Sequence, residues 1–528
     1  MPPSDAGRRG ETACDGPRSD EAGRDKNGRG GFRSDEAGRD QDGHDGTGTR
    51  LAGLLAGSAV GVYLLVVVGA TTALLDGAGS CATWPACNGA WLPDIGDVGM
   101  VVAWSHRVGT VLVGLLLLAT AWVAFRNSSP RRVRAALGVA LLSYPVQIAV
   151  GALTVVGATT TALAAVHLVV AVAIFTAIVL ALLWSLEAVT PSEPVGDADP
   201  STASGTGPPP ETPLGPGGPA GTASEVDASN RASVTSGQAP SLRDRAVGYV
   251  LLTKPKLWWL LCLVAVAAMA LAAGPALDVG TVVPTVAGGV FAIGASGTFN
   301  HVLERDVDRR MSRTDERPLV EGHVPVRHAL AFGFVLAGAS VAVFLAFVNV
   351  LAAALGVMAI LFYSVGYTLV LKPNTSQNVV IGGAVGAFPA LIGWAAVENT
   401  VGVPALVLGG VIFLWTPAHF YNLALAYRED YANAGIPMLP VVRGAVVTRR
   451  HILAYLGATM VGAVLLGTTA TLGWAFALTA TVAGGVFLWA VVHLHRERTE
   501  AAAFRAFHAS NGYLASLLLV VIVDALVV

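Results

Sequence analysis

Three side chains with oxygen atoms that can bind metals recur at four-residue intervals in one polar segment: Asn300, Glu304 and Asp308. Each four-residue step turns a helix only about 40° beyond a full circle, so the three share one helical face, whereas Asp306 points elsewhere. Two carboxylates and an amide oxygen on one face suit a hard cation such as Mg²⁺, which often shares its ligands with substrate phosphates. The spacing therefore predicts a metal site.

Arg309, Arg313 and Arg317 continue the same spacing, and guanidinium groups match phosphate oxygens in a fork geometry. A second polar cluster follows later in the chain, where Asp430 and its neighbour Glu429 are expected to supply a second metal site. The two clusters together predict the ionisation of a prenyl diphosphate. A metal would neutralise the departing diphosphate, and an allylic cation would meet an acceptor held in the bilayer.

Ordinary charged loops at the cytoplasmic ends of helices are the alternative, and for one loop alone they are the more frequent explanation. Two clusters at a membrane boundary favour function, because keeping charge near a span costs on the order of a few kcal/mol per residue. A transporter or a heme-binding membrane module is a further alternative. A transporter predicts inverted internal repeats, and neither alternative explains the face shared by Asn300, Glu304 and Asp308.

The elements that position these residues are expected to be membrane-spanning helices. The chain has 528 residues, of which 54% are hydrophobic and 13% charged, whereas soluble domains carry about 25% charged residues. About twenty apolar residues in a helix cross the hydrocarbon core of a bilayer. The composition predicts an all-α fold, a polytopic transmembrane helical bundle. The formal net charge of −2 gives no indication of a nucleic-acid partner.

Apolar stretches give about four plus nine spans. The first four are expected near Leu51–Leu75, Val101–Phe125, Val133–Val156 and Leu163–Trp184. The other nine are expected near Leu257–Ala273, Val282–Val302, Ala329–Phe347, Leu351–Leu371, Val379–Val397, Pro404–Leu425, Ile452–Thr471, Trp474–His493 and Tyr513–Val528. Residues 50–186 and 246–528 are therefore predicted to be two membrane domains.

Two polar segments flank the first domain. Residues 1–49 are charged and Gly-rich and lack the apolar stretch of a secretory signal, so we expect a disordered tail. Residues 187–245 are rich in Pro, Gly and Ser and predict a disordered, flexible linker.

The distribution of basic residues predicts the orientation in the cell membrane, because Lys and Arg favour cytoplasmic loops. Alternate loops carry them, at Arg126, Arg131, Arg132 and Arg134, at Arg305, Arg309, Arg310, Arg313, Arg317 and Arg327, at Lys372, at Arg428, Arg443, Arg449 and Arg450, and at Arg496, Arg498 and Arg505. The intervening loops 76–99, 157–161, 274–280 and 398–402 contain none. We expect the N-terminus, the linker and both acidic clusters in the cytoplasm and the C-terminus outside.

The second domain resembles the heme O synthase branch of the UbiA-type intramembrane prenyltransferases. The resemblance covers roughly residues 251–528. It rests on LTKPK at 252–256, RTDERPL at 313–319, QNVVIGGAVGAFPALIGWAAV at 377–397 and DYANAGIPMLPVVRG at 430–444. It implies farnesyl diphosphate as donor, Mg²⁺ as cofactor and a vinyl group of heme B as acceptor. A different lipid or aromatic acceptor is the rival within the same fold.

The resemblance also assigns roles to residues. Asn300, Glu304 and Asp308 are implied to hold the metal-diphosphate from the first motif, and Asp430 from the second. The residues implied to bind diphosphate are Lys254, Arg309, Arg313, Arg317 and Arg428. Glu304 departs from the family pattern, which has aspartate there, and Tyr427 stands where an arginine is expected. His419 either contacts heme or caps a buried polar network.

The first domain carries its own candidate residues. Cys81 and Cys87 lie in CATWPACNG on the expected outer side, where nearby cysteines can form a disulfide; a CxxC metal site needs tighter spacing. His106 and His167 lie near the outer ends of two spans, with Arg107 available for a heme propionate. These histidines are either hydrogen-bonded helix contacts or axial heme ligands.

Residues 51–186 resemble one half of heme A synthase. The matching strings are GATTALLDGAGSCATWPACNG at 69–89, WSHR at 104–107 and QIAVGALTV at 147–155. The full family enzyme has two such halves, and Ala103 stands where its catalytic glutamate would fall. We therefore expect a heme-binding or partner-docking module, with a separate heme A synthase as a possible partner; an inactive remnant is the alternative.

Overall fold

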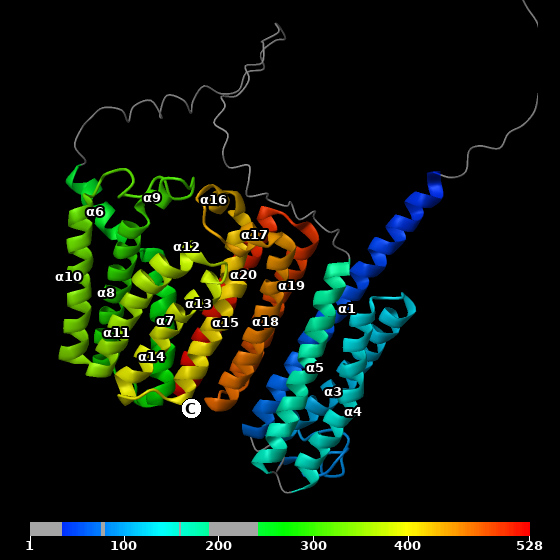
Figure 1. Ribbon diagram of the computed structural model, residues 1–528. Helices are drawn as coiled ribbons and strands as arrows, with labels where there is room; N and C mark the ends of the chain where they lie inside the picture. The colour runs from blue at the N-terminus through cyan, green and yellow to red at the C-terminus, as the bar shows by residue number, and fades with distance from the viewer. Residues whose placement is uncertain (1–33, 75–79, 158–159, 189–240, 528) are drawn as a thin grey trace, which may run out of the picture. The chain divides into compact units, whose positions relative to one another are not determined.

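The computed structural model describes residues 34–74, 80–157, 160–188 and 241–527 of the chain (Figure 1). These residues form helices and contain no strand. Within them, 13 helical stretches are long and apolar enough to cross a membrane, four before residue 189 and nine after residue 240. The predicted all-α bundle of about four plus nine spans is therefore confirmed.

The first group of helices contains four spans. They are α1 (Ser34–Leu74), α3 (Val98–Arg126), α4 (Arg131–Val156) and α5 (Thr161–Ala188). Because α1 begins at Ser34, the prediction that residues 34–49 are disordered is wrong. Extending an existing helix costs less than nucleating one, so the apolar part of α1 can propagate the helix towards its N-terminal end. The predictions for residues 1–33 and 189–240 lie outside the described residues.

The second group carries the residues of interest. Its spans are α7 (Trp258–Ala273), α8 (Val279–Leu303), α10 (Val326–Phe347), α11 (Val350–Leu361) with the π-helical η4 (Phe362–Leu371), α14 (Ala384–Glu398), α15 (Val403–Ala426), α18 (Gly444–Thr469), α19 (Trp474–Glu497) and α20 (Glu500–Val527). Shorter elements connect them: α6 (Leu242–Leu252), η2 (Pro255–Leu257), η3 (Gly274–Ala276), α9 (Arg305–Asp308), α12 (Lys372–Asn374), α13 (Asn378–Gly382), α16 (Arg428–Asn433) and α17 (Leu439–Val442).

Polar side chains start several of these helices. Ser241 and Asp244 form a reciprocal capping box on α6. Asp278 accepts from the backbone of Thr281 at the start of α8, and Asn349 caps α11 in the same way. Each cap satisfies backbone N–H groups that a helix leaves without partners. These helices therefore begin at defined residues, which fixes the position of each functional side chain along its helix.

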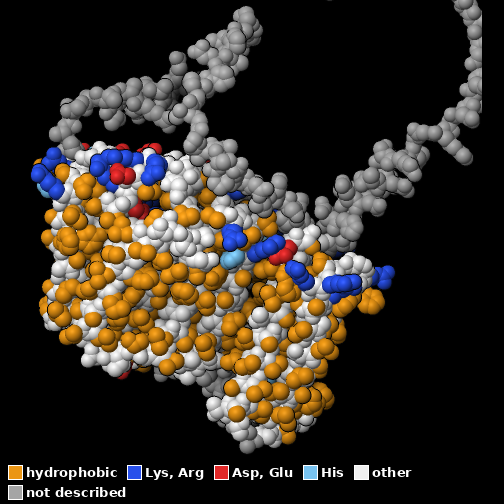
Figure 2. Space-filling model, in the orientation of Figure 1, with side chains coloured by type: hydrophobic (Ala, Val, Ile, Leu, Met, Phe, Trp, Pro, Cys, Tyr) orange, Lys and Arg blue, Asp and Glu red, His pale blue; other side chains and the backbone are white. Residues whose placement is uncertain are grey.

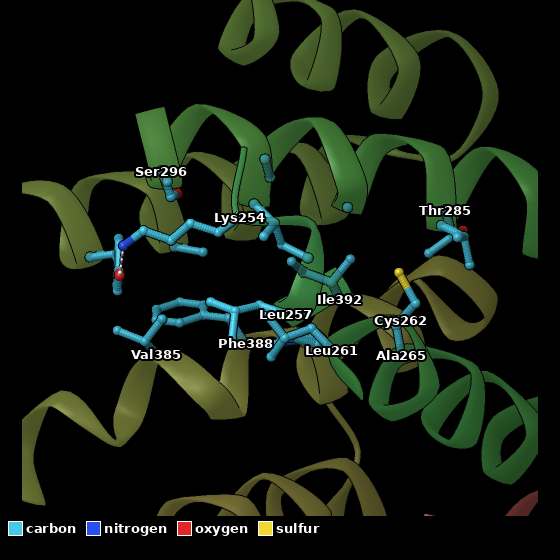
Figure 3. A pocket seen from close by; sticks show the side chains of 18 residues that line it. Lys254, Leu257, Leu261, Cys262, Ala265, Thr285, Ser296, Val385, Phe388 and Ile392 are labelled. Carbon is cyan, nitrogen blue, oxygen red and sulfur yellow. Dashed lines mark hydrogen bonds between the residues drawn. The ribbon is translucent and has the colours of Figure 1, made fainter. Parts of the chain in front are cut away.

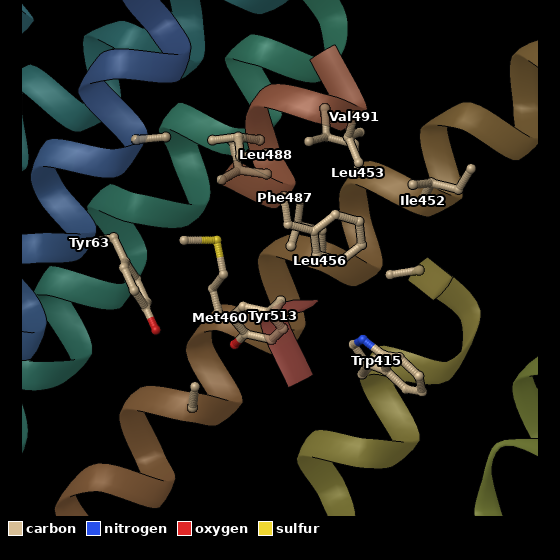
Figure 4. Close-up of a cluster of buried hydrophobic side chains, with 14 of the residues drawn as sticks. Tyr63, Trp415, Ile452, Leu453, Leu456, Met460, Phe487, Leu488, Val491 and Tyr513 are labelled. Atoms are coloured by element: carbon tan, nitrogen blue, oxygen red, sulfur yellow. The ribbon is translucent and has the colours of Figure 1, made fainter. Parts of the chain in front are cut away.

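A large apolar core lies among α15, α18, α19 and α20. Figure 4 shows Trp415, Leu456, Phe487 and Tyr513 within it, together with Tyr63 of α1. Each of these side chains is 6% exposed or less. The first group of helices thus shares a core with the second. Burial of this kind stabilises the packing mainly through dispersion, because lipid tails are as apolar as the side chains.

Charged side chains gather at one end of the helices. In Figure 2, Lys and Arg form a rim along the upper edge, and the sides below are largely apolar. Many large apolar side chains of the spans are exposed there, including Leu142 at 77% and Phe347 at 71%. A chain with such flanks needs a bilayer around it.

Candidate active site

The first acidic cluster lies where α8 stops. Glu304 has φ −96° and ψ 2° and ends the helix, so the helical face expected to carry Asn300, Glu304 and Asp308 is interrupted at its middle residue. The backbone spacing survives the break, because Glu304 N–H donates to the Asn300 carbonyl at 2.9 Å and Asp308 N–H donates to the Glu304 carbonyl at 2.8 Å. Asn300, Glu304 and Asp308 are 2%, 6% and 2% exposed, whereas the Asp306 side chain is 83% exposed.

Each of the three buried side chains contacts a different cation. Lys372 Nζ lies 2.6 Å from Glu304 Oε1, and Arg317 Nη1 lies 2.6 Å from Asp308 Oδ2. Lys254 Nζ donates to Asn300 Oδ1. Buried charges require such pairing, because desolvation otherwise outweighs the Coulombic gain. The site therefore holds three cations beside three oxygen-bearing side chains.

The two carboxylates differ in their electrostatic surroundings. Burial alone would raise the pKa of Glu304, but Lys372 and Lys254 outweigh it and hold that pKa below its ordinary value. Burial raises the pKa of Asp308, and Arg317 opposes this only in part. Both groups thus depend on neighbouring cations to remain ionised inside the protein.

Lys372 and Tyr363 were missed by the sequence analysis as site residues. Lys372 was used there only for orientation, and Tyr363 was taken as part of an apolar span. Both belong to or follow η4, a π-helical stretch of a kind that is often found at functional sites. Tyr363 Oη accepts from Lys254 Nζ at 3.1 Å, and Asn300 Nδ2 donates to Thr368 Oγ1 at 3.0 Å. A basic residue closing a span was the signal that could have identified Lys372.

Lys254 reaches the cluster because of an unusual backbone turn. Its φ of 53° and ψ of 59° lie in the left-handed region, and Pro255 disfavours the right-handed helical region at the residue before it. Gly297 of α8 lets this turn approach closely, because an added Cβ would lie 3.0 Å from the Leu252 carbonyl oxygen and 3.3 Å from Lys254 Cγ. Strained backbone of this kind persists where the surroundings determine it, often at functional sites.

The second acidic cluster contacts the loop that follows the first. Asp430 accepts from Ser312 Oγ at 2.7 Å and from the backbone N–H of Arg313 at 3.1 Å. The Arg313 guanidinium donates to Tyr431 Oη at 3.1 Å and lies 4.9 Å from the centre of the Tyr427 ring. Hydrogen bonds from both side chains and backbone therefore join the two polar loops.

The geometry does not bring all the predicted site residues together. Among the described residues, no three His, Cys, Asp or Glu side chains lie close enough to hold a metal by themselves, so Asp430 does not complete a site with Glu304 and Asp308. Arg428 and Glu429 are exposed. The arginines also diverge, because α9 ends at residue 308: Arg309 pairs with exposed Asp306 at 3.2 Å, whereas Arg317 alone of the three arginines contacts Asp308.

An apolar pocket lies next to the acidic cluster, and Lys254 is one of the residues that line it. Its walls come from α7, α8, α11, η4 and α14, and most of the side chains that line it are apolar. Figure 3 shows Lys254 at one end, Phe388 and Ile392 along the wall, and Cys262 and Thr285 at the other end. The arrangement suits a ligand with a charged head and a long apolar tail.

Comparisons with known proteins agree with this geometry. A model of the UbiA prenyltransferase family matches residues 260–517, and a model of a cytochrome oxidase assembly protein matches residues 35–179. Protoheme IX farnesyltransferase of Haloarcula marismortui is 54% identical over 90% of this chain and 98% of its own length. Protoheme IX farnesyltransferase 1 of Natronomonas pharaonis is 54% identical over 91% and 99%. The chain belongs to the protoheme IX farnesyltransferases.

A solved structure of a UbiA homologue from Archaeoglobus fulgidus, bound to DMAPP and Mg²⁺, is also similar. It has a TM-score of 0.42 and 17% sequence identity, and the match covers 52% of this chain and 98% of that protein.

The first domain holds two partly buried histidines, His106 and His167. His106 Cε1 lies 3.1 Å from where a Cβ on Gly69 would be, and His167 Cε1 lies 2.9 Å from that position on Gly151. His167 Nε2 lies 3.2 Å from Gln147 Nε2. The Nδ1 atoms of both histidines are buried and have no hydrogen-bond partner among the described residues, which is rare for buried polar groups.

Arg107 contacts the loop that precedes α3. Cys81 and Cys87 form a disulfide. Arg107 donates to the carbonyls of Thr83 at 2.9 Å, Pro85 at 3.1 Å and Cys81 at 3.0 Å. Three loop carbonyls thus bind the guanidinium group of Arg107, and the expectation that it serves a heme propionate stays a prediction.

His419 of the farnesyltransferase lies in an aromatic stack. Its ring centre is 4.2 Å from that of Trp415 and 4.4 Å from that of Phe507, and its Nδ1 lies 2.7 Å from Ser510 Oγ. Ser510 also accepts from Trp415 Nε1 at 2.9 Å through its carbonyl. Of the two roles left open for His419, these contacts favour the capping of a polar network.

Proposed function

We propose that the protein transfers the farnesyl group of farnesyl diphosphate to a vinyl group of heme B and so forms heme O. The bond between farnesyl C1 and the diphosphate oxygen breaks, and C1 bonds to the outer vinyl carbon. Water adds its oxygen to the inner vinyl carbon and loses one proton. The products are heme O, diphosphate and that proton. Family membership supports this reaction.

The observation that carries the proposal is the position of Lys254. Its ammonium group contacts Asn300 in the charged layer, and the same side chain lines the apolar pocket. A prenyl diphosphate needs that junction, because its leaving group is highly charged and its chain is not. Lys254, Lys372 and Arg317 are the cations available there to oppose negative charge developing on the departing diphosphate.

The donor set also fits a divalent metal. Asn300, Glu304 and Asp308 supply one amide and two carboxylate functions, the hard oxygen ligands that Mg²⁺ requires. When bound, Mg²⁺ would neutralise charge on the diphosphate. The protein's own residues orient the substrate and exclude water: the apolar walls hold the chain, and the three cations hold its head.

The rim of basic side chains (Figure 2) supports an orientation of the protein in the membrane. The positive-inside preference supports a cytoplasmic N-terminus, cytoplasmic acidic loops and an outer C-terminus. Farnesyl diphosphate would then reach Lys254 from the cytoplasm, where soluble diphosphates are made.

For the first domain we favour heme binding over an inactive remnant. The observation behind this choice is a pair of histidines whose Nδ1 atoms are buried and unpartnered among the described residues, His106 on α3 and His167 on α5. Imidazole nitrogens are frequent axial ligands of heme iron. Such a module could hold heme B before transfer, or hold heme O for a separate heme A synthase.

The test of the main proposal is a membrane assay with heme B, farnesyl diphosphate and Mg²⁺, read by mass spectrometry of extracted hemes. Wild type and Asp306→Asn, a matched change at an exposed neighbour, should form heme O. Asp308→Asn should form at most about 1% as much, consistent with the loss of a buried electrostatic group near the leaving diphosphate. If wild type prenylates another acceptor but not heme B, the protein is a prenyltransferase for a different lipid or aromatic acceptor. Full activity of Asp308→Asn would remove the assigned role of the acidic face.

A further inference from the structure

The apolar pocket runs along one face of α8. The rise per residue of this helix therefore gives the distance of each lining residue from the charged end of the pocket. Ser296, Ile293, Gly289 and Thr285 all line the pocket, in this order away from Lys254. A helix rises 1.5 Å per residue, which places Ile293 about 10 Å, Gly289 about 16 Å and Thr285 about 22 Å along α8 from Asn300. Positions on α8 can therefore be compared with the length of a bound chain.

Prenyl chains differ in length by whole isoprene units. An extended farnesyl chain has about twelve carbons in its main chain and spans about 14 Å, since a carbon–carbon bond is about 1.5 Å long. A geranyl chain spans about 9 Å and a geranylgeranyl chain about 19 Å on the same basis. With the diphosphate beside Asn300, a geranyl chain ends near Ile293 and a farnesyl chain near Gly289.

Gly289 presents empty space at that depth. A Cβ added to Gly289 meets nothing within 4 Å. The neighbouring Gly288 faces the other way, where an added Cβ would lie 2.8 Å from the Phe344 ring. Close helix packing therefore explains Gly288 but not Gly289. A glycine inside a helix is less favourable than alanine, so the missing side chain at Gly289 needs another explanation.

Two β-branched side chains of α8 line the pocket beyond Gly289. Val286 and Thr285 are the next side chains of α8 on the pocket wall, and both are β-branched. Such side chains have restricted χ1 angles and yield little space. The Thr285 hydroxyl donates to the Thr281 carbonyl at 2.7 Å, which further fixes its rotamer. The space opened by Gly289 is thus followed along α8 by two side chains with restricted rotamers.

We propose that the absent side chain at Gly289 sets the length of the prenyl donor, because the third isoprene unit of a farnesyl chain lies against it. This inference rests on the proposed function only in requiring a prenyl diphosphate in this pocket. It adds a residue that determines specificity. A larger side chain at position 289 should exclude the third unit and leave room for two.

The experiment is a competition assay in membranes. Wild type, Gly289→Leu, Gly289→Ala and Gly338→Leu receive heme B, Mg²⁺ and equal concentrations of geranyl, farnesyl and geranylgeranyl diphosphates. The prenylated hemes are quantified by mass. Gly338, on α10, is the matched control, because a Cβ added there also meets nothing within 4 Å. Gly338 lines a different groove of the protein.

Wild type and Gly338→Leu should form mainly the farnesyl product. Gly289→Leu should raise the ratio of geranyl to farnesyl product at least tenfold, since one methylene in an apolar pocket already discriminates by about tenfold or more. Gly289→Ala should shift the ratio in the same direction by less. Formation of geranyl product by Gly289→Leu would itself show that the variant folds.

Two results would overturn the inference: unchanged product ratios in both Gly289 variants, or an equal shift in Gly338→Leu. If Gly289→Leu is inactive with every donor, Gly289→Ala decides the question by its ratio. If wild type prenylates a different acceptor and not heme B, the proposed acceptor is wrong. The competition among donors is then measured on that other acceptor, so the two failures are distinguishable.

Discussion

Lys372 Nζ lies 2.6 Å from Glu304 Oε1 and joins the end of η4 to the residue at which α8 stops. The side chains are 17% and 7% exposed. Removing one partner of a buried pair leaves an uncompensated charge, which costs about 3–5 kcal/mol, whereas removing both costs much less. Single and double variants of this pair can therefore distinguish a loss of stability from a loss of catalysis.

We predict that Lys372→Met lowers the unfolding temperature in detergent markedly and abolishes prenyl transfer. Adding Glu304→Gln to it should recover most of the stability but no activity, because the substrate still lacks the cation. Thermal unfolding and product formation of the two single variants and the double variant form the measurement. A double variant that regains activity would show that Lys372 serves only to neutralise Glu304.

Metal dependence should respond to the length of the side chain at position 304. Glu304→Asp withdraws the carboxylate by one methylene from its present position beside Lys372. We expect the Mg²⁺ concentration for half-maximal activity to rise about tenfold, because Mg²⁺ demands near-ideal ligand geometry. Chelation should abolish wild-type activity, and added Mg²⁺ should restore it. Asp306→Glu, at the exposed neighbour, should leave the Mg²⁺ dependence as in wild type. A shift in that variant would show that the Mg²⁺ dependence is not specific to the carboxylate of Glu304.

The contact between the two polar loops gives a prediction about protection from protease. Asp430 accepts from both Ser312 and the backbone of Arg313. Asp430→Asn weakens both bonds, since a carboxylate accepts more strongly than an amide. Limited trypsin digestion should then cleave after Arg313 several-fold faster than in wild type. Glu429→Gln, at an exposed position next to it, is the control, and equal rates in both variants would argue against a loop contact through Asp430.

The sequence predicted the helices of this protein better than the contacts of its site. Long apolar stretches specify spans almost without context, because a bilayer leaves a backbone few alternatives to the helix. Helical spacing also predicted that Asp306 points away from Asn300 and Asp308, and it is exposed whereas they are buried. These features depend on local order in the chain.

The remaining features depend on residues distant in sequence. The arginines at 309, 313 and 317 continue a helical spacing, but the helix ends at Asp308, and the three diverge into separate contacts. Lys372 lies 68 residues from Glu304, so no local pattern pairs them. Arg107 was expected at a heme propionate, yet it binds carbonyls of the preceding loop. A long basic side chain has many reachable partners, and only the folded arrangement selects among them.

Heme binding by the first domain is predicted to depend on His106 and His167. Protein purified from membranes supplied with heme B should retain heme with a low-spin absorbance spectrum, and His167→Ala should lose at least half of it, because one axial ligand disappears. His328→Ala, on the exposed surface of α10, should retain the wild-type heme content. If His167→Ala keeps the full spectrum while its thermal stability falls, then His167 is a helix contact through Gln147. That result would leave the first domain without a heme ligand at this position and would favour the inactive remnant.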